Sequence, residues 1–131
     1  MGIEDNKDMI RRLFGEVWRN GEVDSVERFY AAGPILDDLQ AFATGLCAAF
    51  PDWRATIDEL VAEGDRVVVR WTGQSTHRGE WSGVAATNRQ VTITGIDVEH
   101  FVDGKIVDEH SNVDMLGFMR QIGALATPAV G

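Results

Sequence analysis

The stretch TITGIDVEHFVDGKIVDEHSNVDMLG, residues 92–117, decides the fold because two runs with strand character flank one turn. The turn is the Asp103-Gly104 pair, since aspartate followed by glycine is a strong local signal for a β-hairpin. Strands are predicted on either side of it, at Gln90–Val102 and Lys105–Val113. The stretch therefore predicts a long antiparallel hairpin.

Two turns are compatible with this hairpin, and they orient its side chains differently. A two-residue turn pairs Val102 with Lys105 and places His100 and Asp114 on opposite faces of the sheet. A three-residue turn, with the glycine in a bulge, pairs Phe101 with Lys105 and places His100 and Asp114 on the same face. The choice of turn decides whether these two side chains can act together.

We favour the three-residue turn because of the alternation in the first strand. Ile96 and Val98 alternate with Asp97 and Glu99, and the apolar pair is expected to face the core. His100 shares the parity of the apolar pair. On this interpretation the concave wall of the sheet carries four polar side chains: His100, His110, Asn112 and Asp114. An imidazole and a carboxylate in an apolar wall are costly unless they are paired or functional.

The first third of the chain is predicted to be helical. A stripe at helical spacing predicts an amphipathic helix that ends at Asn20-Gly21, and its members are Ile10, Leu13, Phe14, Val17 and Trp18. A short helix is predicted from Ser25 to about Ala31, broken by Gly33-Pro34. A third helix is predicted from Asp37 or Asp38 to Phe50, before Pro51.

The rest of the chain is predicted to be mainly strands. Two further strands are expected at Trp53–Glu63 and Arg66–His77, with a Gly64-Asp65 turn between them. A short helix is expected at Leu116–Ile122, and residues 124–131 are expected to form a frayed tail. Helices followed by an antiparallel meander predict a single α+β domain over residues 1–131, with helices covering a curved sheet that encloses a ligand cavity.

The charge and cysteine content exclude several classes of protein. Lysine and arginine number 12 against 21 aspartates and glutamates, for a net charge of −9, which argues against binding to nucleic acid or an anionic membrane. The sequence contains no apolar run long enough for a transmembrane helix, and MGIEDNKDMI does not resemble a signal peptide. We therefore expect a cytoplasmic protein. Cys47 is the single cysteine, so a disulfide or a cysteine-based zinc site within one chain is excluded.

No metal or cofactor is predicted. The three histidines, His77, His100 and His110, lack the spacing of a metal motif. The glycines form neither a dinucleotide-binding fingerprint nor a P-loop, and no serine lies in a nucleophile elbow.

Three segments carry a resemblance to a known family. They are RRLFGEVWRNGEVDSVERF at residues 11–29, AAFPDWRATIDELVAEGDRVVVRWTGQSTHRGEW at 48–81, and VTITGIDVEHFVDGKIVDEHSNVDMLGFMRQIG at 91–123. In order and spacing they resemble the SnoaL-like polyketide cyclases of the nuclear transport factor 2-like superfamily. The resemblance implies a cone-shaped α+β barrel, a homodimer, and a cofactor-free pocket for a small apolar organic substrate.

The resemblance also implies a catalytic pair. The acid/base of these cyclases, an aspartate at the end of the last strand, corresponds to Asp114, and the histidine fourteen positions earlier corresponds to His100. The chain departs from the family in its short FYAAGPILDD segment, residues 29–38, and in having His110 where relatives carry tryptophan. Asp114 has a second interpretation, because aspartate is also a preferred N-cap for the helix that follows.

The residues expected to contact the substrate are mostly aromatic: Phe14, Trp18, Phe50, Trp53, Trp71, His110, Asn112 and Phe118. The expected reaction is an intramolecular aldol-type ring closure of a polyketide-like carbonyl compound, with proton transfer by Asp114. Two alternatives stay open: an epoxide-opening cyclase or hydrolase on the same fold, and a dimer that binds a small ligand without catalysis.

Overall fold

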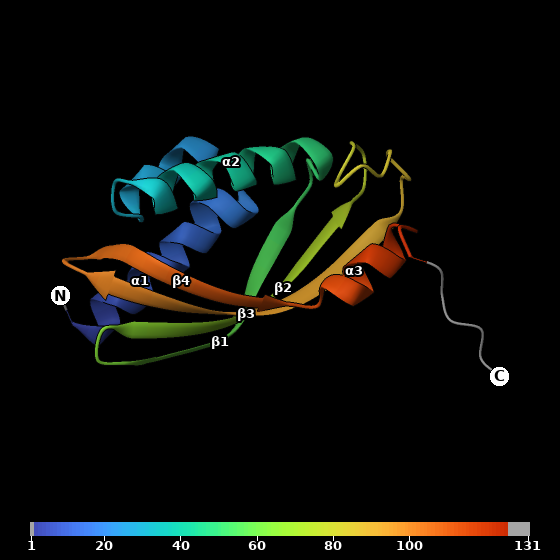
Figure 1. The fold of residues 1–131 in the computed structure, drawn as a ribbon. Coiled ribbons are helices and arrows are strands. Elements are labelled where there is room, and N and C mark those ends of the chain that lie inside the picture. The colour runs from blue at the N-terminus through green and yellow to red at the C-terminus, as the bar shows by residue number, and fades with distance from the viewer. Residues whose placement is uncertain (1, 126–131) are drawn as a thin grey trace.

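The computed structural model describes residues 2–125 (Figure 1). The outermost part of the predicted frayed tail, residues 126–131, lies outside this range. The elements in chain order are α1 (Ile3–Leu13), η1 (Phe14–Arg19), η2 (Val23–Arg28), α2 (Pro34–Ala49), β1 (Arg54–Glu63), β2 (Arg66–Thr76), β3 (Gln90–Val102), β4 (Lys105–Val113) and α3 (Met115–Gln121). This order confirms the predicted α+β class with helices first.

The N-terminal helix follows the predicted stripe. Every member of the stripe is at most 9% exposed, from Ile10 at 0% to Trp18 at 9%. The helix changes after Leu13 from α-helical to π-helical hydrogen bonding and ends before Gly21, whose φ of 73° is readily adopted by glycine. The stripe thus packs against the sheet over both α1 and η1.

Helix α2 begins earlier than predicted. Gly33 has a φ of 128°, and Pro34 occupies the first turn, where a missing N–H is tolerated. The Gly33-Pro34 pair therefore starts this helix as well as ending the preceding segment. The predicted end before Pro51 is confirmed.

The four strands form one antiparallel sheet in the order β1-β2-β3-β4. The sheet is curved, and α1 and α2 lie against one of its faces, while α3 follows β4 at the far end (Figure 1). Side chains from the helices and from this inner face form the core. Within residues 2–125, no helix is both long and apolar enough to cross a lipid bilayer.

The β3–β4 turn differs from the prediction. Val102 pairs with Lys105, so the turn has two residues, and both of them, Asp103 and Gly104, have positive φ as a type I′ turn requires. The predicted three-residue turn is wrong. A bulge at Val107 then shifts the register by one residue. Beyond the bulge, the even-numbered residues of both strands share one face, as the three-residue turn had predicted. His100 therefore lies opposite Asp108, Val98 opposite His110 and Ile96 opposite Asn112.

Ile96, Val98 and His100 lie on the outer face of the sheet. The expectation that they face the core is therefore wrong. Ile96 is 45% exposed, whereas Glu99 is 1% exposed. The inner face of β3 is set by Val91, Ile93 and Phe101, whose odd parity Asp97 and Glu99 share. The apolar pair Ile96 and Val98 therefore gives the wrong face for β3, because the apolar residues near both ends of the strand point to the opposite, inner face.

Candidate functional site

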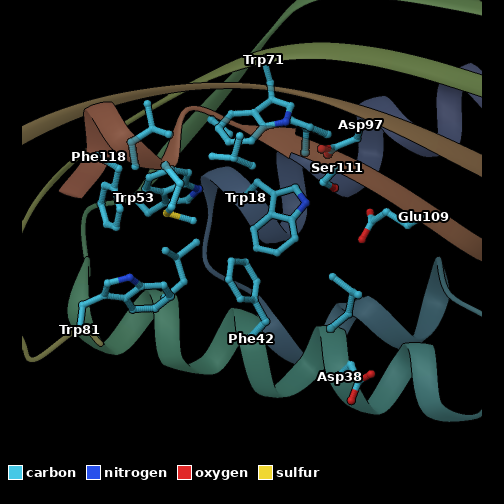
Figure 2. A pocket seen from close by; sticks show the side chains of 17 residues that line it. Trp18, Asp38, Phe42, Trp53, Trp71, Trp81, Asp97, Glu109, Ser111 and Phe118 are labelled. Carbon is cyan, nitrogen blue, oxygen red and sulfur yellow. The ribbon is translucent and has the colours of Figure 1, made fainter. Parts of the chain in front are cut away.

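A cavity of about 390 Å³ lies between the helices and the inner face of the sheet. Figure 2 shows its aromatic walls and, at one end, a group of oxygen-bearing side chains. The lining residues are Phe14, Trp18, Asp38, Leu39, Phe42, Leu46, Trp53, Ala55, Trp71, Trp81, Ile93, Asp97, Glu109, Ser111, Val113, Met115 and Phe118.

Four tryptophans line the cavity, and edge-to-face contacts with neighbouring aromatic rings hold them. The ring centroids of Trp53 and Trp71 are 6.3 Å apart, and Phe42 links Trp18 to Trp81 at 6.3 and 6.0 Å. Trp71 lies across Gly95 of the neighbouring strand, where a Cβ atom would collide with the indole. Because Gly95 has no Cβ atom, the Trp71 indole can lie over this position and form part of the cavity wall.

Acidic residues form the polar end of the cavity. On paired β3 and β4, Asp97 lies opposite Ser111, and Glu99 lies opposite Glu109. Carboxylate oxygens of the three acids lie within 4.8 Å of one another. The Tyr30 hydroxyl donates a 2.9 Å hydrogen bond to Glu109. Asp97, Glu109 and Ser111 reach the cavity, whereas Glu99 lies beneath them.

Burial changes the protonation of this cluster. Loss of hydration raises the pKa of Asp97 to about 6, although its neighbours Trp71 and Ser111 partly oppose the rise. Burial, followed by the adjacent Glu109, raises the pKa of the Glu99 carboxyl group well above its usual range. Burial and then Glu99 also raise the pKa of the Tyr30 hydroxyl. Asp97 is thus poised to gain or lose a proton close to physiological pH.

The structure places five of the predicted substrate contacts in the cavity wall: Phe14, Trp18, Trp53, Trp71 and Phe118. Phe50 is fully buried and lies behind the wall, with its ring 5.4 Å from that of Phe118 and 5.8 Å from that of Trp81. Phe50 therefore supports wall residues from behind.

The predicted catalytic residues lie outside the cavity and apart from each other. His100 Nε2 is 2.7 Å from Asp65 Oδ2 near the end of the hairpin. Asp114 caps α3, with its carboxylate accepting from Gly117 N at 2.9 Å. The backbone N–H of Asp114 donates a hydrogen bond to the carbonyl oxygen of Thr94. Thr94 lies six positions before His100 on β3, so Asp114 and His100 are separated by about 20 Å along the strand. The hairpin brings both side chains to the same face of the sheet, but it does not bring them together.

His110 and Asn112 also lie on the outer face and are exposed. His110 Nε2 is 3.2 Å from Asp108 Oδ2, its neighbour on the same strand. Neither residue lines the cavity.

Twelve of the 17 wall residues are not among the predicted substrate contacts, and six of these are polar or aromatic: Asp38, Phe42, Trp81, Asp97, Glu109 and Ser111. A signal for the acids existed, because Asp97 and Glu99 share the parity of the buried ends of β3. Acids that share the parity of the buried apolar side chains near both ends of a strand indicate a polar patch on the inner face of the sheet. Phe42 lies within the predicted third helix at a spacing that equally suits core packing, and Trp81 is one of four tryptophans whose type alone suits either a pocket lining or the core.

Among the described residues, Asp97, Glu99 and Glu109 form the group best suited to hold a cation. Three carboxylates at close range are hard oxygen ligands of the kind that Mg²⁺ and Ca²⁺ prefer. Their chemistry also suits proton transfer, because a carboxyl group with a pKa near 6 is an effective acid and base near neutral pH.

The chain belongs to the SnoaL-like polyketide cyclase family, whose model matches residues 8–122. This confirms the resemblance in the three quoted segments. No protein of curated function matches the chain in sequence.

Solved structures agree with this fold. AclR, a candidate hydroxylase from Streptomyces galilaeus, is 24% identical with a TM-score of 0.87, over 98% of this chain and 87% of AclR. TsrD from Streptomyces laurentii is 23% identical with a TM-score of 0.85, over 95% and 99% of the two chains. A candidate polyketide cyclase from Acidithiobacillus ferrooxidans is 25% identical with a TM-score of 0.81, over 96% and 100%.

Proposed function

We propose that the protein is a cyclase or isomerase that moves protons on a small apolar carbonyl compound, with Asp97 as the acid/base. The observation that carries the proposal is a carboxyl group with a raised pKa at the one acidic end of an aromatic cavity. Membership of a polyketide cyclase family supports the same class of reaction. We assign the acid/base role to Asp97 rather than to Asp114, because Asp97 lines the cavity and Asp114 does not.

The proposed reaction is an intramolecular aldol closure that needs no other reagent. The ionised Asp97 removes a proton from a carbon next to a carbonyl, and the carbon–hydrogen electrons form an enolate. The enolate carbon attacks a second carbonyl carbon of the same molecule, so one carbon–carbon bond forms and one carbonyl π bond breaks. The resulting alkoxide takes the proton back from Asp97, and the product is an isomer of the substrate.

The neighbours of Asp97 support this cycle. The Ser111 hydroxyl lines the cavity directly across the strand pair and can donate a hydrogen bond to the substrate oxygen. The largely apolar wall can hold a flat carbon skeleton, which would bring the two reacting carbons together.

Solvent-deuterium exchange tests the proton-transfer step directly. A small ketone with acidic α-protons, 2-tetralone, is incubated with the protein in D₂O, and deuterium at the α-carbon is followed by NMR. The wild type is expected to accelerate exchange, and Asp97→Asn is expected to lose the acceleration. Asp114→Asn is the matched control and should keep it. Acceleration that survives in Asp97→Asn and disappears in Asp114→Asn would overturn the assignment.

Epoxide opening is the second candidate, because the wall presents two carboxyl groups, Asp97 and Glu109, on paired strands. One protonated carboxyl group could deliver its proton to the epoxide oxygen while the other, ionised, accepts a proton from the attacking water or hydroxyl group. Product formed in ¹⁸O-labelled water separates the reactions, since a hydrolase incorporates the label and an aldol closure does not.

We also propose that the protein is a homodimer. Exposed apolar side chains on the sheet support this, including Val61 at 55% and Ile96 at 45% exposure. Light scattering that gives the mass of one chain would contradict it. The cytoplasmic location stays a prediction.

A further inference from the structure

We propose that the cavity selects substrates that carry a positively charged nitrogen, such as a protonated amine, in addition to their flat apolar body. The inference deepens the proposed function, because it takes the same cavity as the substrate site and names a chemical feature of the substrate. It is carried by the charges of the cavity wall, by its aromatic composition and by one buried carboxyl oxygen, Glu99 Oε2, that has no hydrogen-bond partner among the described residues.

The charges of the wall are all negative. Asp38, Asp97 and Glu109 line the cavity, and its described lining contains no lysine, arginine or histidine. Among residues 2–125, the ion pairs that form also leave these three acids without a cationic partner. Asp38 is exposed to solvent, whereas Asp97 and Glu109 are half-buried. A half-buried carboxylate on an apolar wall is costly without a cation, and a bound cation would reduce that cost.

The aromatic side chains supply the second half of a cation site. Four tryptophans and Phe42 lie around the cavity, and Figure 2 shows Trp18 between the aromatic group and the acids Asp97 and Glu109. The faces of indole rings attract organic cations, and tryptophan does so more strongly than other aromatic residues. An ammonium group at this position would contact indole carbon on one side and carboxylate oxygen on the other.

Glu99 provides an independent observation. This residue is 1% exposed, and its Oε2 has no hydrogen-bond partner among the described residues. Its carboxyl oxygen lies within 4.8 Å of the oxygens of Asp97 and Glu109. An ammonium group bound close to the cluster would supply a hydrogen-bond donor for this oxygen. A cation held by Asp97 and Glu109 would lie beside it.

An organic cation fits this site better than a metal ion. A hard divalent ion needs six or more oxygen ligands or retained waters, whereas most of the surrounding wall is aromatic or aliphatic carbon. The cavity of about 390 Å³ falls within the range of organic ligand sites. A positive charge near the acids would also offset the negative charge of the enolate that the proposed reaction creates.

Binding of two matched probes tests the inference without turnover. The probes are 2-naphthylmethylamine, which is a cation at pH 7.5, and the neutral 2-naphthylmethanol, and binding is followed by tryptophan fluorescence and calorimetry. The wild type should bind the amine at least about tenfold more tightly than the alcohol. Asp97→Asn and Glu109→Gln should each reduce that ratio, whereas Asp108→Asn on the outer face should not. Circular dichroism confirms that each variant is folded.

Two results would overturn the inference. One is equal or tighter binding of the alcohol, and the other is tight binding of Mg²⁺, Mn²⁺, Ca²⁺ or Zn²⁺ that displaces the amine. The pH dependence provides a further readout, because the amine should bind more weakly below about pH 6, where Asp97 takes up a proton. A wild type that exchanges deuterium into 2-tetralone but shows no preference for the amine would retain the proposed function and lose only this inference.

Discussion

Both faces of the β3–β4 hairpin carry acidic or acid-paired side chains, but their surroundings differ. On the outer face, imidazoles meet carboxylates in exposed pairs, His100 with Asp65 and His110 with Asp108. On the inner face, Asp97 and Glu109 share a cavity with no cation beside them. Solvent screens the outer pairs, whereas burial raises the pKa of Asp97 on the inner face. The comparison teaches that a histidine next to an acid is a weaker indication of function than an acid without a partner.

The largest expected effect is on Asp97. Replacing it with asparagine should slow α-proton exchange by about 10²- to 10⁴-fold, because the proton acceptor is lost. The same change should raise the free energy of unfolding at pH 7.5, since the ionised carboxylate is destabilising where it is buried. The sign follows from the pKa of about 6 in the folded state, above the ordinary value of 3.8, so folding becomes less favourable as pH rises from about 4 to about 6.

Urea unfolding of the wild type and Asp97→Asn at pH 4, 6 and 7.5 measures this difference. The gap between the two proteins should widen from pH 4 to pH 6 and then stay constant. A gap that is independent of pH would contradict a raised pKa at Asp97.

Gly95→Ala should produce the next largest effect. The added methyl group would collide with the indole of Trp71, so the ring must move or the strands must separate, at a cost of about 1–3 kcal/mol in the free energy of unfolding. Gly15→Ala is the matched control, because a Cβ atom there contacts nothing within 4 Å. Thermal unfolding measures both variants, and equal midpoints would show that Trp71 is not held against Gly95.

Asp114→Ala should affect stability and leave proton exchange unchanged. The carboxylate accepts from Gly117 N at the start of α3, and loss of an N-cap costs about 0.5–2 kcal/mol. Chemical denaturation gives the stability, and the deuterium-exchange rate per folded molecule gives the activity. A fall in the exchange rate that exceeds the loss of folded protein would return a catalytic role to Asp114.

The smallest effect is expected at His100. Its pairing with Asp65 is exposed to solvent, and the hydrogen bond from the imidazole lowers the pKa of the Asp65 carboxyl. Because the pKa of Asp65 is lowered in the folded state, the pairing stabilises the fold above pH 3.8, the ordinary pKa of aspartate. This contribution to stability is lost as the pH falls below that value. His100→Gln should therefore shift the melting temperature less than Asp114→Ala at pH 7, and exchange should be unaffected. A large loss of exchange would place His100 in the reaction.

Much of the fold could be predicted from the sequence because its signals are local. The stripe from Ile10 to Trp18, the Asp103-Gly104 turn and the exact ends of β3 and β4 depend on short-range spacing and turn chemistry. The candidate site could not be predicted in the same way. The rule that apolar side chains face inward holds for packed cores, but the inner face of this sheet lines a cavity and carries acids.

The bulge at Val107 shows the second limit of sequence reasoning. The predicted turn was wrong, yet His100 and Asp114 still share a face, because the bulge changes the parity that the turn had set. Sharing a face did not bring the two residues together, since they lie near opposite ends of the hairpin. Position along a strand matters as much as parity, and it becomes evident only when the neighbouring strands and helices are in place.

An NMR titration of the aspartate side-chain carboxyl carbons measures whether Asp97 has a raised pKa. Uniformly ¹³C-labelled protein is titrated from pH 3 to pH 8, alongside Asp97→Asn and Asp114→Asn. One aspartate should titrate near pH 6, and that resonance should be absent from Asp97→Asn and retained in Asp114→Asn. Titration of Asp97 at or below the usual aspartate range would contradict the account.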